Sequence, residues 1–244
     1  MNTKDFHNHT TFSDGKKTPE QTVLEAIEKG LKTVGISDHS FVAFDPDYCM
    51  KPEKIGEYIG EIQRLKEKYA DKIEILCGIE QDIFSGVPEG DFDYVIGSVH
   101  YIKAGEEYIP VDATAAHLKQ GADKYFGGDI YALIEEYYRL VGTLPEKTGA
   151  DIVGHFDLIT KFQEKEKLFD EQNERYTRAW QAAADKLLSA GLRFEINSGA
   201  ISRGYRTTPY PAKEIKEYIL QNGGKFVRGS DSHRANTVAN FIDL

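Results

Sequence analysis

The chain has 244 residues, 40% of them hydrophobic and 29% charged, which allows a full hydrophobic core in one large domain or two small ones. Its net charge of −10 and sequence pI near 5.2 argue against a broad nucleic-acid-binding surface, which would need patches of Lys and Arg. No apolar run approaches the roughly 18 residues of a membrane span and no signal segment precedes the first motif, so we expect a cytoplasmic protein with neither nucleic acid nor membrane as a partner.

Short apolar runs alternate along the chain with longer segments of helical periodicity. In chain order we predict strands at 4–7, 33–37, 73–79, 94–99, 151–154, 193–196 and 225–228, and helices at 18–29, 52–69, 130–144, 170–190 and 212–221. Thr18 can cap the first helix ahead of Pro19, and Gly191 and Gly223 follow the last two helices, as a left-handed C-cap favours. Strands that alternate with helices imply parallel crossover units, and a closed sheet of seven such strands is a (β/α)7 barrel.

Two segments depart from this alternation. Between residues 79 and 94 a loop containing Gly and Pro replaces a helix. Residues 103–129 are long and weakly periodic, and we interpret them as an insertion that forms a lid over the site. Because no internal repeat or low-complexity linker occurs, we predict a single domain over residues 1–244. The two cysteines cannot form a disulfide framework, and Cys77 in its apolar run is expected to be buried.

Six of the seven histidines follow predicted strands, and carboxylates lie in or beside the same turns. The histidines are His7, His9, His39, His100, His155 and His233, and the carboxylates are Asp14, Asp38, Glu80, Asp157 and Asp231. Because the C-terminal ends of barrel strands meet at one mouth, these side chains should converge there. Imidazoles and carboxylates gathered in one place are typical ligands of divalent metals, which predicts a metalloenzyme. The sixth strand carries Glu195 and Asn197 instead of such a ligand.

The spacing of some of these residues supports metal binding. His7 and His9 are two residues apart, so both imidazoles face the same side of an extended chain, and Asp231 and His233 repeat that spacing. Glu80, directly after an apolar run, is placed to bridge two ions.

Other polar residues near the mouth have less specific roles. Asp14 could equally be a turn residue before Gly15, and Asp38 and Asp157 adjoin histidines that they could orient. His117, within the insertion, is expected to be a surface residue. The basic residues near the mouth are Lys161, Arg203, Arg206 and Arg234. A small set of cations beside a metal centre suits a phosphate group.

These motifs resemble those of a known superfamily over almost the whole chain. The sequences HNH (7–9), SDH (37–39), SVH (98–100), GHFD (154–157) and SDSH (230–233), with Glu80, resemble the polymerase-and-histidinol-phosphatase (PHP) superfamily. The segments GHFDLITKF, EINSGAISR and TPYP look like its stand-alone histidinol-phosphate phosphatase branch. The resemblance implies a distorted (β/α)7 barrel with two or three divalent ions, and histidine-rich, thiol-free ligation permits Zn²⁺, Mn²⁺ or Fe²⁺.

The resemblance also implies ligand sets and an activity. One ion would take His7, His9, Glu80 and Asp231, a second would share Glu80 and add His100 and His155, and a third would take Asp14, His39 and His233. The implied reaction is hydrolysis of L-histidinol phosphate to L-histidinol and phosphate, a step of histidine biosynthesis. Glu80, Asp231, His39 and Arg203 would form the catalytic set, and Arg203, Lys161 and Arg206 would contact the substrate phosphate.

Alternatives remain at this point. Within the same chemistry they are a PHP-type protein-tyrosine phosphatase and a nucleotide or nucleic-acid phosphoesterase. A non-enzymatic metal-binding module would predict gaps in the ligand set. A metal-dependent amidohydrolase shares the barrel and the ligand types but acts on C–N bonds. The sequence leaves the oligomeric state open.

Overall fold

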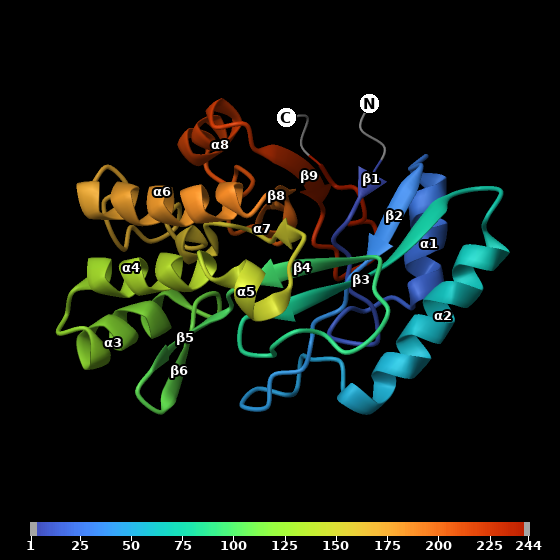
Figure 1. The fold of residues 1–244 in the computed structure, drawn as a ribbon, viewed down its shortest axis with the longest axis horizontal. Helices are drawn as coiled ribbons and strands as arrows, with labels where there is room; N and C mark the ends of the chain where they lie inside the picture. Colours follow the sequence, from blue (N-terminus) through green and yellow to red (C-terminus); the bar gives the residue numbers. More distant parts are fainter. Residues whose placement is uncertain (1–3, 242–244) are drawn as a thin grey trace.

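The computed structural model describes residues 4–241, and a curled sheet of seven parallel strands forms its centre (Figure 1). The strands, in their order around the sheet, are β1 (Lys4–Asp5), β2 (Thr33–Ile36), β3 (Glu74–Asp82), β4 (Tyr94–Ser98), β7 (Ile152–Val153), β8 (Arg193–Asn197) and β9 (Lys225–Gly229). Backbone hydrogen bonds join the two outer strands: the Phe6 N–H donates to Arg228 O at 2.9 Å, and the His9 N–H donates to Ser232 O at 2.9 Å. The predicted seven-stranded barrel is confirmed.

Helices surround the strands: most cover the outside of the barrel, and the short one at Gly199–Ser202 lies at its mouth, where Ser202 lines the pocket described below. The helices are α1 (Pro19–Glu28), α2 (Ile55–Lys68), α3 (Ala115–Tyr125), α4 (Ile130–Val141), α5 (Leu144–Thr148), α6 (Glu174–Ser189), α7 (Gly199–Ser202) and α8 (Lys213–Gln221), with 3-10 turns at Pro52–Lys54 and Leu158–Thr160. Figure 1 shows α1 and α2 on one side of the barrel and α3, α4 and α6 on the other. As predicted, Thr18 caps α1, and Gly191 and Gly223 adopt φ values of 78° and 81° after α6 and α8. None of the described helices is long and apolar enough to cross a membrane.

The structure differs from the sequence prediction at several elements. β3 continues through Asp82 because β4 pairs with it as far as that residue, so Glu80 lies within the strand rather than after it. The predicted helix 130–144 divides near Gly142 into α4 and α5.

The segment 103–129 is more regular than its sequence suggests. It contributes to an antiparallel hairpin of β5 (Tyr101–Ala104) and β6 (Glu107–Pro110), and it continues into α3, which packs against β6 and α4. Of its described residues, Asp112 alone lines the pocket described below. The segment therefore reaches the pocket at Asp112 and does not cover it as the expected lid.

The interior of the barrel is filled by side chains. The ring of Tyr94 packs edge-to-face on Phe6 with centroids 5.6 Å apart, and its hydroxyl donates to the Phe6 carbonyl oxygen. Gly35 and Gly78 make room for this ring, because a Cβ atom at either position would overlap it. The barrel is thus a packed core rather than a channel, which leaves its mouth for chemistry.

Tyr58 of α2 ties its helix to two strands. Its buried hydroxyl lies 2.8 Å from the carbonyl oxygens of both Ile36 and Gly78. Tyr58→Phe keeps the ring but removes this donor, and we expect the free energy of unfolding to fall by about 1–2 kcal/mol. Chemical denaturation of both proteins measures the difference. An unchanged midpoint would mean that the sheet alone satisfies these carbonyl groups.

Candidate metal centre

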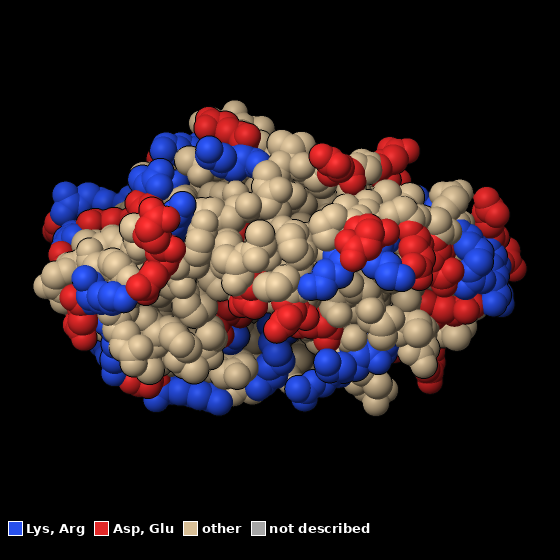
Figure 2. Space-filling model, turned by 90° about the horizontal axis from the view of Figure 1, so that it is seen from below, with Lys and Arg blue, Asp and Glu red and all other residues tan. Residues whose placement is uncertain are grey.

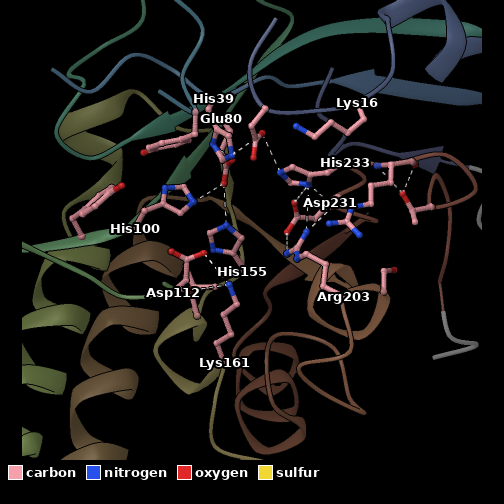
Figure 3. Close-up of a pocket in the computed structure, with 17 residues that line it drawn as sticks. Lys16, His39, Glu80, His100, Asp112, His155, Lys161, Arg203, Asp231 and His233 are labelled. Carbon is pink, nitrogen blue, oxygen red and sulfur yellow. Dashed lines mark hydrogen bonds and ion pairs between the residues drawn. The ribbon is translucent and has the colours of Figure 1, made fainter. Parts of the chain in front are cut away.

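The nine predicted metal ligands converge at the C-terminal ends of the strands. Figure 3 labels those of them that line the pocket, except Asp14. Asp14, His39, Glu80, His100, His155, Asp231 and His233 line a pocket of about 390 Å³. His7 and His9 are fully buried behind it and contact Glu80 and Asp231. The volume of the pocket is typical of sites for small molecules.

Glu80 lies at the centre of this cluster. Its Oε2 atom is 2.7 Å from His39 Nδ1, 3.4 Å from His7 Nε2 and 3.6 Å from His9 Nε2, and its Oε1 atom is 2.9 Å from His155 Nε2 and 3.4 Å from His100 Nε2. Burial raises the pKa of Glu80, but the surrounding imidazoles lower that pKa well below its usual value overall, so the carboxylate is ionised. A carboxylate whose two oxygens face separate groups of imidazoles has the geometry to bridge two cations.

A second grouping surrounds Asp14. Its Oδ1 atom lies 3.3 Å from His233 Nε2 and 3.8 Å from His39 Nε2. The ring of His9 packs on both of these histidines, with centroid distances of 4.1 Å to His233 and 4.2 Å to His39. Asp231 Oδ1 lies 3.4 Å from both His9 Nε2 and His233 Nδ1. Asp14 is therefore part of the cluster, in addition to its place in a turn.

The donor atoms of the cluster fit a metal ion. Among the described residues, His7 Nε2, both ring nitrogens of His9 and Asp14 Oδ1 are buried without a hydrogen-bond partner. Burial and the nearby His233 and His39 lower the pKa of His9 well below its usual value, so its imidazole is neutral and keeps a lone pair. Buried polar atoms without partners are costly, and a bound cation removes that cost. The ligand atoms form three groups, each within 4.8 Å: His9, Asp14, His39 and His233; His7, His9 and Glu80; and His39, Glu80 and His100.

Two carboxylates to which the sequence analysis gives no role contact the Nδ1 atoms of ligand imidazoles, on the side away from Glu80. Glu195 of β8 lies 2.7 Å from His7 Nδ1, and Asp82 of β3 lies 3.1 Å from His100 Nδ1. In both cases the Nε2 atom of the histidine faces Glu80. Metal-binding imidazoles are commonly oriented in this way. The signal in the sequence is positional: Asp82 follows Glu80 by two residues, so both side chains point to the same face of β3.

Asp38 and Asp157 do not orient imidazoles, contrary to our expectation. Asp38 accepts hydrogen bonds from the Thr10 N–H at 2.7 Å and the Ser13 N–H at 3.1 Å, so it holds the loop that follows β1. Asp157 accepts one from the Ala212 N–H at 2.9 Å. Asp38 and His39 are adjacent in an extended segment, so their side chains point in opposite directions, whereas Asp157 lies in the turn after β7, where the alternation of a strand does not hold.

Four cations line the pocket. They are Lys161, Arg203 and Arg234, and also Lys16, which the sequence analysis does not single out. Arg203 Nη2 lies 2.8 Å from Asp231 Oδ2, and its Nη1 lies 3.0 Å from the Asp231 carbonyl oxygen. Lys161 Nζ donates to the carbonyl oxygen of Asp112 at 2.7 Å and to its carboxylate at 3.1 Å. Figure 3 shows Lys161 and Arg203 on the same side of the cluster, below His155 and Asp231.

Arg206 lies outside the pocket lining, contrary to the expected phosphate contact. Its buried guanidinium donates to Thr160 Oγ1, lies 4.0 Å from Asp157 and stands over the ring of Tyr210 at 4.6 Å. Arg206 therefore supports the loop after β7 instead of facing a substrate.

A seven-stranded parallel barrel whose mouth carries imidazoles and carboxylates fitted to divalent cations is the architecture of a metal-dependent hydrolase. The chain belongs to the PHP domain family, whose profile matches residues 5–199. A probable histidinol-phosphatase of Deinococcus radiodurans is 29% identical to it over 248 residues, which cover 96% of this chain and 87% of the relative.

Two solved structures share the fold. A proposed histidinol phosphatase from Listeria monocytogenes superposes with a TM-score of 0.82 at 20% identity, covering 97% of both chains. The histidinol phosphate phosphatase of Lactococcus lactis, complexed with zinc, L-histidinol and phosphate, superposes with a TM-score of 0.71 at 23% identity, covering 96% of this chain and 88% of the other. Both confirm the distorted barrel that the family resemblance implies.

Proposed function

We propose that this protein hydrolyses L-histidinol phosphate to L-histidinol and inorganic phosphate with the help of divalent metal ions at the barrel mouth. The observation that carries the proposal is the complete set of imidazoles and carboxylates around Glu80. Relatives that match nearly the whole chain are named histidinol-phosphatases, and the Lactococcus lactis structure contains zinc together with both products of this reaction.

We propose a centre of two to three ions. One set of ligands is His7, His9, Glu80 and Asp231, a second is Glu80, His100 and His155, and a third is Asp14, His39 and His233. Nitrogen and oxygen ligands without a thiolate suit Zn²⁺, Mn²⁺ or Fe²⁺. When bound, such ions lower the pKa of a water molecule and neutralise phosphate oxygens.

The side chains that line the pocket have two proposed roles, catalysis and binding of the substrate phosphate. Glu80, Asp231, His39 and Arg203 form the proposed catalytic set: all four line the pocket, His39 contacts Glu80 at 2.7 Å and Arg203 contacts Asp231 at 2.8 Å. Arg203 keeps N–H groups that Asp231 does not use, and Asp112 fixes the Lys161 ammonium at the pocket wall. These two cations would bind the substrate phosphate and offset the negative charge that grows as the alkoxide leaves.

The charge of the surface favours a small substrate over a polyanion. Figure 2 shows basic and acidic side chains interspersed on the face that it draws, rather than a continuous basic surface. The net charge of −10 points the same way. A long nucleic-acid strand binds through many Lys and Arg contacts to its phosphates.

The test is a comparison of substrates with protein of measured metal content. For L-histidinol phosphate we expect a kcat/KM roughly 100-fold or more above that for phosphotyrosine, with no cleavage of single-stranded DNA. A chelator should abolish phosphate release, and added Mn²⁺ or Zn²⁺ should restore it, because the ligand atoms converge on one centre.

Two results would contradict this proposal. Faster release from phosphotyrosine would make the protein a tyrosine phosphatase of the same chemistry. Less than one ion per chain by elemental analysis after metal-replete expression would remove the basis for metal-dependent hydrolysis.

A further inference from the structure

Glu195 lies on β8, the strand that supplies no proposed metal ligand, yet its carboxylate contacts ligands from two other strands. Its Oε1 atom lies 2.7 Å from His7 Nδ1, and its Oε2 atom accepts the backbone N–H of His155 at 2.8 Å. The side chain is 1% exposed, so no solvent competes for these contacts. His7 follows β1 and His155 follows β7, so one carboxylate spans a large part of the barrel mouth.

The reach from β8 to β1 depends on a glycine in the strand between them. β9 separates these two strands in the sheet, and its Gly229 pairs with Asn197, two residues beyond Glu195. A Cβ atom at Gly229 would overlap Glu195 Oε1 and lie 2.7 Å from His7 Cβ. Gly229 therefore opens the path along which Glu195 meets His7.

A carboxylate is the group that these contacts require. The His155 backbone N–H can only donate, and the Asn197 side-chain amide donates to the same Oε2 atom at 3.0 Å. A proton on His7 Nδ1 would donate to Glu195 Oε1 at 2.7 Å and would leave the lone pair of Nε2, on the side of Glu80, for a metal ion. A glutamine would place its NH₂ group against a donor on one side or the other, because an amide offers one accepting atom where a carboxylate offers two.

We propose that Glu195 is a positioning residue that sets the tautomer of His7 and fixes the start of the His155 loop, so that a single carboxylate serves both halves of the metal centre. This inference rests on the proposed metal centre. It assigns to the ligand-free strand a part in metal binding, and it makes Gly229 a requirement for that part.

The test is metal affinity and spectroscopy, independent of turnover. Cobalt(II) is the probe, because its visible absorption reports the ligand field of bound imidazoles. Glu195→Gln should weaken Co²⁺ binding by roughly 10- to 100-fold in competition with a chromophoric chelator and should change the visible spectrum of the bound ion. The matched control is Glu135→Gln on α4, where the carboxylate pairs with Arg175 away from the pocket lining. That variant should keep the wild-type affinity and spectrum.

Gly229→Ala provides a second route, since it keeps the carboxylate and its charge but displaces Oε1 from His7. We expect the same direction of change in affinity and spectrum, with a loss at least as large as that of Glu195→Gln, because the added Cβ also crowds His7 Cβ. The loss in the double variant should be smaller than the sum of the two single losses, because both changes remove the contact between Glu195 and His7. Wild-type affinity and an unaltered spectrum in both variants would overturn the role of Glu195. No Co²⁺ binding by the wild-type protein would instead overturn the proposed metal centre itself.

A measurement on the wild-type protein covers the case in which neither variant folds. In zinc-loaded protein with ¹⁵N-labelled histidine, His7 should show a proton on Nδ1 that exchanges slowly with solvent, because Glu195 accepts it in a fully buried site. A proton on Nε2 of His7 would overturn the inference.

Discussion

Glu80→Gln is expected to lower kcat/KM by roughly three orders of magnitude or more, which corresponds to a loss of about 4 kcal/mol of transition-state stabilisation. The reason is geometric, since Glu80 is the one side chain in the described residues that lies within 3.6 Å of His7, His9, His39, His100 and His155 together. An amide keeps the shape of the side chain but loses the negative charge that two cations would share. Initial rates with L-histidinol phosphate and elemental analysis of bound metal measure the two effects.

The control for this variant is His117→Ala. His117 lies on α3, exposed, with its ring beside Thr114 and away from the pocket lining, so its removal should leave rate and metal content unchanged. Equal activity of the two variants would refute the bridging role of Glu80.

Arg203→Met is expected to lower kcat/KM by an amount that corresponds to a loss of about 2–4 kcal/mol of transition-state stabilisation. Losses of this size are typical when other groups that stabilise developing charge are removed. Arg203→Lys keeps the charge but loses the planar fork, so it should lose less but still measurable activity. Bound metal at saturation should stay unchanged in both, because Asp231 keeps its approaches to His9 and to the Asn197 amide.

The metal measurement separates two roles of this guanidinium. Both its Nη atoms contact Asp231, so Arg203 could act solely by holding that carboxylate in place. Lost metal in Arg203→Met would show such a structural role. Near-normal kcat/KM would transfer the phosphate contact to Lys161, which Asp112 already holds at the pocket wall.

The positions of the proposed ligands are predictable from sequence because the histidines occur where apolar runs of strand length end. Apolar runs of strand length end next to His7, His39, His100 and His155, and parallel strands bring their ends to one mouth. The buried position of Cys77 follows from the same runs. Local pattern is sufficient for these features because each depends on the direction of a single strand.

Other features depend on partners that are distant in sequence. The extension of β3 past Glu80 is set by its pairing with β4, and the role of Glu195 is set by His7 and His155, which no local pattern connects to it. Arg203 and Arg206 are three residues apart and look equivalent in sequence. Residues three apart share a face only within a helix, and α7 ends at Ser202, the residue before Arg203. The two side chains therefore diverge: Arg203 lines the pocket, whereas Arg206 contacts Thr160 and Asp157.

The joining of β1 to β9 has a consequence for how the protein folds during its synthesis. His7 and His9 are synthesised well before Asp231 and His233, which contact His9 and Asp14. The hydrogen bonds between Phe6 and Arg228 and between His9 and Ser232 can form only once β9 has emerged from the ribosome, and they close a loop that contains nearly all of the described chain. A nascent or prematurely terminated polypeptide that lacks β9 would therefore hold an incomplete set of ligands. In this topology the proposed ligand set becomes complete only when β9 and the residues that follow it have been synthesised and have joined β1.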